Sequence, residues 1–236
     1  MGQHGQYRAL VAAATLALWA GPGWGACRLA LALGFDVSRS VDAQDYAIQR
    51  DGILAALAAP EIVRALLGSE DHVRLALYEW SGQGAQAMVL DWTEVTSQAD
   101  IDAISARIAA YARSEDRLPT ALGEALDYGL DLLNRAGDCP ARTLDISGDG
   151  RNNDGDGPDI VRARRDPGGV LVNGLAIGGH EADIAVYYRE HLISGKGAFV
   201  EVARIHADFP RAFRRKLERE LTEQLLGRVE TRGDRG

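Results

Sequence analysis

The stretch LALALGFDVSRS, residues 29–40, decides the fold of this chain. Its first seven residues are almost all apolar, which is typical of a parallel strand buried on both faces. Its last five place one carboxylate and two hydroxyls at alternate positions, where that strand is expected to end. Ligands of open α/β sheets bind at the carboxyl ends of the strands. Asp36, Ser38 and Ser40 are therefore candidate ligands of a small hard cation such as Mg²⁺.

The remainder of the chain alternates strands with helices, which predicts a doubly wound α/β sheet covered on both faces. Further strands are expected at 72–80, 86–92, 142–146, 169–177 and 198–202. Helices are expected at 41–59, 98–112, 120–134, 182–193 and 209–226. The Gly-rich turn at 81–84 joins two strands as a hairpin. We therefore expect a mostly parallel, six-stranded sheet with one antiparallel edge strand.

Two more segments add polar side chains at expected strand or helix ends. Thr120 stands just before a predicted helix, and Asp149-Gly150 follows the strand predicted at 142–146. Each segment taken alone is explained better by helix capping, because Ser, Thr and Asp are favoured N-cap residues. The three segments occurring in this order favour a metal site over three separate caps.

This order of motifs resembles the metal-ion-dependent adhesion site (MIDAS) of von Willebrand factor A domains. The resemblance covers nearly the whole chain after its N-terminal segment, and extends to a little-characterised family of exported bacterial proteins built on that domain. Segments similar to that family are residues 46–52, 79–81, 145–153, 173–177 and 195–200. The sequence departs mildly from the wider fold, with Arg39 between the two serines and Pro119 before the threonine.

The resemblance implies a metal site made by five residues, which are Asp36, Ser38, Ser40, Thr120 and Asp149. The hydroxyls would bind Mg²⁺ or Mn²⁺, and the carboxylates would act mainly through ordered waters. One coordination position would stay open for an acidic residue of a protein partner. The expected function is metal-dependent protein binding of the adhesion type, not catalysis. The alternatives are a metal-dependent hydrolase and a structural domain with a vestigial site.

Two cysteines, Cys27 and Cys139, lie nine and ten residues before Asp36 and Asp149. In the von Willebrand A topology the strands that end at these aspartates are adjacent, so the resemblance implies a Cys27–Cys139 disulfide. A bridge of this kind is expected in an oxidising compartment. The alternative for Cys27 is lipidation, which the preceding Trp24 disfavours.

Residues 1–26 are predicted to be a signal peptide, with a positive start at Arg8 and an apolar stretch from Ala9 to Ala20. The alternative for this segment is an uncleaved N-terminal anchor. The chain would therefore be exported to the periplasm or secreted, with no membrane span in its mature form. Residues 27–226 would form the domain, and 227–236 a polar, disordered tail. The formal net charge of −8 argues against nucleic-acid binding. The basic residues from Arg211 to Arg219 alternate with acidic ones, which is typical of a solvated helix face.

Other sites find less support in the sequence. Asn152, Asp154 and Asp156 match the start of a calcium loop, but Ala163 stands where the loop needs Glu. A second cation near Asp154 and Asp156 is thus a weaker expectation than turn formation. The sequence contains no nucleophile elbow and no phosphate-binding loop. Its histidines have no zinc-binding spacing, which predicts no zinc site.

Overall fold

The computed structural model describes residues 25–114, 117–165, 167–181 and 183–233. The predicted signal peptide lies almost entirely outside these residues. No helix among them is both long enough and apolar enough to cross a membrane.

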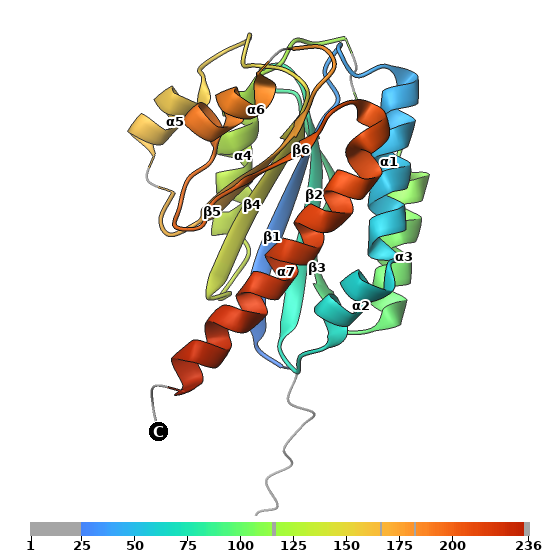
Figure 1. The fold of residues 1–236 in the computed structure, drawn as a ribbon, viewed down its shortest axis with the longest axis vertical. Coiled ribbons are helices and arrows are strands. Elements are labelled where there is room, and N and C mark those ends of the chain that lie inside the picture. The colour runs from blue at the N-terminus through green and yellow to red at the C-terminus, as the bar shows by residue number, and fades with distance from the viewer. Residues whose placement is uncertain (1–24, 115–116, 166, 182, 234–236) are drawn as a thin grey trace, which may run out of the picture.

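The sheet has six strands in the order β3-β2-β1-β4-β5-β6, as Figure 1 shows. The strands are β1 (Cys27–Asp36), β2 (His72–Trp80), β3 (Gln86–Val95), β4 (Ala141–Gly148), β5 (Leu171–Ile177) and β6 (Val200–Ala203). Only β3 runs antiparallel to its neighbour. The predicted fold, five parallel strands and one antiparallel edge strand, is confirmed.

Helices cover both faces of the sheet (Figure 1). One face carries α1 (Ala43–Leu57), α2 (Pro60–Leu67), α3 (Gln98–Ala110) and α7 (Phe209–Gly233). The other carries α4 (Leu122–Asn134), α5 (Pro158–Arg164), α6 (Ile184–Tyr187) and the π-helical turn η1 (Tyr188–Leu192). A 3₁₀ turn, η2 (His206–Asp208), precedes α7.

Alternate residues of β1 pack into the hydrophobic cores on the two faces of the sheet. Leu29, Leu31, Leu33 and Phe35 point into the core under α1 and α7, while Ala30 and Ala32 face the core under α4. Every residue of β1 is buried, as expected for a central parallel strand. This strand therefore holds Asp36 at a fixed place at the edge of the sheet.

Cys27 and Cys139 form a disulfide, with 5.0 Å between their Cα atoms. The bridge joins the start of β1 to the residues just before β4, and these two strands pair directly. The disulfide prediction is confirmed. Its sulfurs lie at the edge of the sheet opposite to Asp36.

Two features of the helices differ from the sequence-based expectation. Helix α5 was not predicted, because the Asn, Asp and Gly residues before it dominate the pattern; the signal was Pro158, since proline favours the first position of a helix. The helix expected at 182–193 is divided into the short α6 and the π-helical turn η1.

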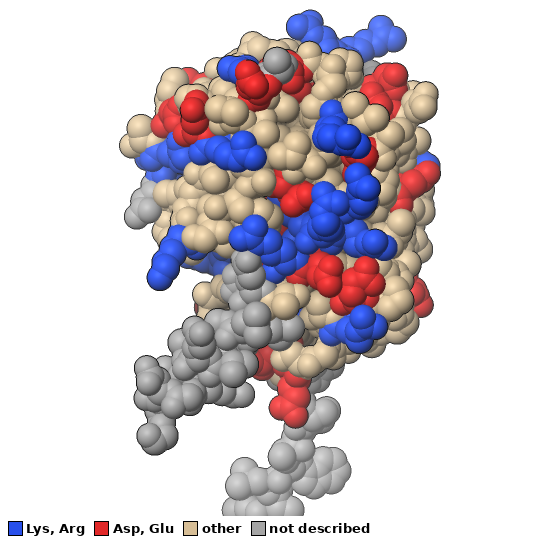
Figure 2. Space-filling view, in the orientation of Figure 1, with Lys and Arg blue, Asp and Glu red and all other residues tan. Residues whose placement is uncertain are grey.

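The predicted solvated face of α7 is correct for its arginines but wrong for Lys216 and Glu220, which are fully and nearly fully buried. Figure 2 shows the basic side chains interleaved with acidic ones across this face of the molecule. Two of the arginines pair with other elements: Arg214 lies 3.4 Å from Glu61, and Arg215 contacts Glu201. Lys216 turns inward because it pairs with Asp145, which β4 buries beneath the helix.

Candidate metal centre

The structure brings all five predicted ligands together at the carboxyl edge of the sheet. Asp36 is the last residue of β1, and Ser38 and Ser40 lie in the turn that follows. Thr120 lies two residues before α4, and Asp149 comes directly after β4. Because β1 and β4 are neighbouring parallel strands, their carboxyl ends place Asp36 and Asp149 side by side.

The three hydroxyls face one another. Ser38 Oγ lies 3.2 Å from Ser40 Oγ, and the Thr120 hydroxyl donates to Ser38 Oγ over 3.3 Å. The Ser40 hydroxyl donates to Asp149 Oδ1 over 2.6 Å. The backbone N–H of Ser38 donates to Asp36 Oδ1 over 2.7 Å, which fixes the turn. Five oxygen-bearing side chains thus form one continuous cluster.

None of these hydroxyls caps a helix. Helix α1 is capped by Asp42, whose carboxylate accepts from the backbone N–H groups of Gln44 and Asp45. Helix α4 begins after Ala121 without any side-chain cap, although Thr120 stands next to it. The capping alternative for these residues is therefore wrong. The hydroxyls are directed into the cluster and not toward helix ends.

The two carboxylates of the cluster are fully buried and incompletely paired. Asp36 Oδ2 and Asp149 Oδ2 have no hydrogen-bond partner among the described residues. Burial, together with the nearby charge of Asp149, raises the pKa of Asp36 to about 7. Unpaired carboxylate oxygens beside three hydroxyls form a donor set that fits Mg²⁺ or Mn²⁺, which prefer oxygen ligands.

Solvent reaches this cluster from one side. Asp36, Ser38 and Asp149 are buried and Thr120 nearly so, whereas Ser40 is partly exposed. Arg39, between the two serines, is exposed, and its backbone N–H donates to Leu118 O over 2.9 Å. A cation held here would therefore be accessible next to a positive side chain.

Arg113 holds the turn that carries the two serines. Its guanidinium donates to the carbonyl oxygens of Val37 and Val41, over 3.0 and 2.6 Å. It also lies over the ring of Tyr46, 5.1 Å from the ring centre. These contacts hold the turn in one conformation, so that its hydroxyls are positioned in advance.

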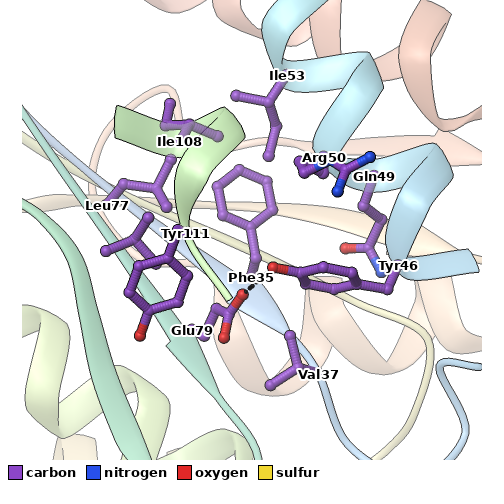
Figure 3. A pocket seen from close by; sticks show the side chains of 11 residues that line it. Phe35, Val37, Tyr46, Gln49, Arg50, Ile53, Leu77, Glu79, Ile108 and Tyr111 are labelled. Atoms are coloured by element: carbon purple, nitrogen blue, oxygen red, sulfur yellow. Dashed lines mark hydrogen bonds between the residues drawn. The ribbon is translucent and has the colours of Figure 1, made fainter. Parts of the chain in front are cut away.

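Glu79 supports the same region from β2, as Figure 3 shows. The Tyr46 hydroxyl donates to Glu79 Oε1 over 2.7 Å, and the backbone N–H of Ser114 donates to Oε2 over 2.8 Å. Beside them lies a cavity of about 20 Å³, lined by residues that include Phe35 and Tyr111. Its volume suits about one water molecule and no larger ligand.

The acidic loop at 151–159 is tied to the protein by its own side chains. Thr120 and Asn153 are bonded reciprocally: the N–H of Thr120 donates to Asn153 Oδ1, and the N–H of Asn153 donates to Thr120 O, both over 2.9 Å. Asp154 accepts two hydrogen bonds from Gln83, and Asp156 lies 2.5 Å from an Arg164 nitrogen. These contacts favour the turn-forming alternative, and a second cation here stays a prediction.

Three residues that the sequence did not single out lie next to Asp149. The ligand atoms of Asp45, His180 and His206 are within 4.8 Å of one another, an arrangement able to hold a metal ion. Burial lowers the pKa of His206. No short sequence spacing predicts the group, because its residues come from the first turn of α1, the loop after β5 and the 3₁₀ turn η2. The available signal was that both histidines follow strands expected to end at the same edge.

The fold is that of von Willebrand factor A domains. Proximal thread matrix protein 1 of the mussel byssus, solved with a zinc-occupied MIDAS motif, is similar with a TM-score of 0.61 and 14% identity. A von Willebrand factor type A protein of Catenulispora acidiphila gives 0.58 and 16%, and the pilus adhesin SpaC of Lactobacillus rhamnosus GG gives 0.58 and 13%.

The alignments cover 83% of this chain in each case, and 46%, 43% and 30% of the respective structures. The chain thus spans less than half the length of these relatives, and at such identities the likeness concerns the fold. No curated protein sequence matches that of this chain. A family model described as a protein of unknown function, DUF1194, matches residues 26–225, and the chain therefore belongs to this family.

Proposed function

We propose that this protein is an exported binding module, periplasmic or secreted, that holds Mg²⁺ or Mn²⁺ and uses it to capture a carboxylate of a partner protein. The observation that carries the proposal is the direction of the three hydroxyls. Ser38, Ser40 and Thr120 lie within 3.2–3.3 Å of a neighbouring hydroxyl, while the adjacent helices are capped otherwise or not at all.

The arrangement leaves a bound cation short of anionic ligands. The Ser and Thr hydroxyls are neutral, and Asp149 Oδ1 already accepts from Ser40. Mg²⁺ keeps several waters when few protein groups bind it. A carboxylate that arrives from solvent replaces one of these waters and supplies the missing charge. The proposed partner is thus a protein that presents an exposed Asp or Glu. The zinc-occupied MIDAS motif of the mussel matrix protein, which shares the fold, supports a cation at this place.

The proposal can be tested with Mn²⁺ as a paramagnetic probe. In the Mn²⁺-loaded protein, water in the open position shortens the relaxation time of solvent protons, and a peptide containing Glu should reverse part of this effect by displacing that water. The same peptide with Gln is the matched control and should have no effect. Equal responses to both peptides, or none to either, would contradict carboxylate capture.

Hydrolysis by metal-activated water is the second candidate function, and one observation favours it. Such a reaction needs a base near the metal, and the imidazoles of His180 and His206 each lie 3.9 Å from Asp149. Turnover of ester or phosphoester substrates that is lost in Thr120→Ala would favour this candidate over the binding module.

A further inference from the structure

A group of nitrogen and oxygen donors lies beside the proposed magnesium site. Asp45 comes from the first turn of α1, His180 from the loop after β5, and His206 from the 3₁₀ turn η2 after β6. These segments are far apart in sequence, but β5 and β6 are paired parallel strands, so the residues after them meet at the same edge of the sheet.

The nitrogen and oxygen atoms of these side chains lie close together but are not hydrogen-bonded to one another. His206 Nδ1 lies 3.5 Å from Asp45 Oδ2. His180 Nε2 and His206 Nε2 each lie 3.9 Å from Asp149 Oδ2. The two imidazole rings are 6.1 Å apart, edge to face. His206 thus faces Asp45 through Nδ1 and Asp149 through Nε2. One ligand atom from each of Asp45, His180 and His206 lies within 4.8 Å of the other two.

Two buried atoms on the Asp149 side of this group lack a partner. His206 Nε2 and Asp149 Oδ2 make no hydrogen bond within the part of the chain that the structure describes. His206 is 6% exposed and Asp149 fully buried. Buried polar atoms are normally paired, and those that are not indicate a missing ligand, ion or water. This observation is independent of the spacing of the three residues.

We propose that Asp45, His180 and His206 form a second metal site, specific for a transition cation of the zinc class, with Asp149 Oδ2 at its border. Two imidazoles and a carboxylate are typical ligands of Zn²⁺, whereas Mg²⁺ binds oxygen. Zn–N bonds of 2.0–2.1 Å in a tetrahedron place donors about 3.3 Å apart. His206 Nδ1 and Asp45 Oδ2 are 3.5 Å apart, and the donors of the three residues lie within 4.8 Å of one another, so the group must contract around a cation. His180 is half-exposed and follows Gly178-Gly179 in a loop, so that it has room to approach.

Asp149 would then stand between two cations of different chemistry. Its Oδ1 accepts from Ser40 in the oxygen cluster, and its Oδ2 faces the two imidazoles. The two proposed sites share Asp149 alone, because Asp45, His180 and His206 are not among the five proposed oxygen ligands. It adds a zinc-type cation to the surface at which the partner is proposed to dock.

Calorimetric titration of Zn²⁺ into the chelator-stripped protein, held in saturating Mg²⁺, tests this site. Loss of one imidazole in His180→Gln or His206→Gln should weaken zinc binding by more than the roughly 10–100-fold that loss of a second-shell partner causes. His191→Gln is the matched control, because His191 contacts Asp159 elsewhere on the surface, and it should bind zinc like the wild type. Co²⁺ in place of Zn²⁺ should give the visible absorption of a tetrahedral site.

Thr120→Ala separates this inference from the proposed function. If the two sites are distinct, this variant loses Mg²⁺ binding and retains zinc binding. Zinc binding that is lost in Thr120→Ala but unchanged in both histidine variants would overturn the inference, and would place zinc at the hydroxyls. Circular dichroism of each variant establishes that it is folded. Because His180 is half-exposed, its replacement should leave the fold intact, and an unchanged zinc affinity in His180→Gln also overturns the site.

Discussion

Gly148 is the single residue on which the geometry of the proposed magnesium site depends most. A Cβ atom at this position would lie 2.5 Å from the Tyr188 hydroxyl, 2.9 Å from Asp36 Oδ2 and 3.0 Å from the Trp80 ring. All three neighbours are fully buried. Because a buried ring cannot move aside as a surface side chain does, any side chain here must displace the Asp36 carboxylate.

Gly148→Ala is therefore expected to lower the free energy of unfolding by about 1–3 kcal/mol, the usual effect of overpacking a core. It should also weaken Mg²⁺ binding, since Asp36 is displaced. Urea unfolding and calorimetry measure the two effects. Gly157→Ala is the control, because a Cβ there meets no atom within 4 Å. A Gly148→Ala protein as stable as this control would contradict the packing described around Asp36.

The clustering of the five proposed oxygen ligands could be predicted from the sequence and its resemblance, whereas the histidine group has no local sequence pattern. Asp36, Ser38 and Ser40 occupy one short stretch, and their type and spacing carry the information. His180 and His206 meet only because β5 and β6 are adjacent. Their separation in sequence depends on the length of the intervening loop and helix, so no spacing rule identifies them.

At the scale of elements, α7 is fixed to the sheet by a buried polar cluster. Lys216 Nζ lies 2.6 Å from Asp145 Oδ1 and 2.6 Å from Glu220 Oε1. Asn173 of β5 donates to Glu220 Oε1 over 2.7 Å. One lysine thus faces two carboxylates in the core, and this excess of acidic groups favours a proton on one of the carboxylates. Burial raises the pKa of Asp145 to about 7, although Lys216 acts in the opposite direction.

This cluster predicts a pH dependence of stability. The unfolded chain releases the Asp145 proton near 3.8, and the folded protein releases it near 7. Between these values the folded state binds more protons, so this group makes the free energy of unfolding fall as pH rises. The Asn of Asp145→Asn does not titrate. The free energy of unfolding of this variant, measured with urea, should therefore fall less steeply between pH 5 and 7 than that of the wild type.

Asp91→Asn, a change of an exposed aspartate on β3, is the control for this prediction and should retain the wild-type slope. Identical slopes for wild type and Asp145→Asn would mean that Asp145 is ionised in the folded protein over the whole range. The cluster would then consist of two carboxylates that share the charge of Lys216.

Sequence periodicity identified α7 but not its buried polar side chains. Lys and Glu four residues apart are usually an exposed pair, and the pair Lys216–Glu220 has this spacing. Its burial depends on Asp145 and Asn173, which the sheet places under the helix from β4 and β5. Tertiary partners of this kind are invisible in the local pattern.

At the scale of the whole molecule, the disulfide and the proposed metal centre lie at opposite edges of the sheet. The bridge closes a loop with a sequence separation of 112 residues, for which the chain-entropy model gives about 4–5 kcal/mol. Replacement of both cysteines by Ala is expected to lower the free energy of unfolding by about 2–5 kcal/mol. Metal affinity should be unchanged, because Asp36 lies at the far end of β1.

Urea unfolding with and without reductant measures this contribution. Reductant should destabilise the wild type and leave the Cys27→Ala, Cys139→Ala protein unaffected, which is the internal control. Native protein should contain no thiol that reacts with a labelling reagent. Labelling of Cys139 before unfolding would contradict the bridge.

The disulfide and the closeness of Asp36 and Asp149 both follow from the adjacency of β1 and β4. The resemblance to von Willebrand A domains supplied this adjacency, which composition and periodicity alone do not provide. The sequence does not identify the partner, since the charge and shape of the surface around the site depend on loops that are far apart in the chain.

The central claim is that the hydroxyl cluster binds Mg²⁺, and calorimetric titration of Mg²⁺ into the chelator-stripped protein tests it most directly. Wild type and Thr222→Ala, which removes an exposed hydroxyl on α7, should bind one ion saturably. Thr120→Ala and Ser40→Ala should lose this binding while remaining folded. Absence of Mg²⁺ and Mn²⁺ binding in the wild type, or equal binding in all four proteins, would contradict the account.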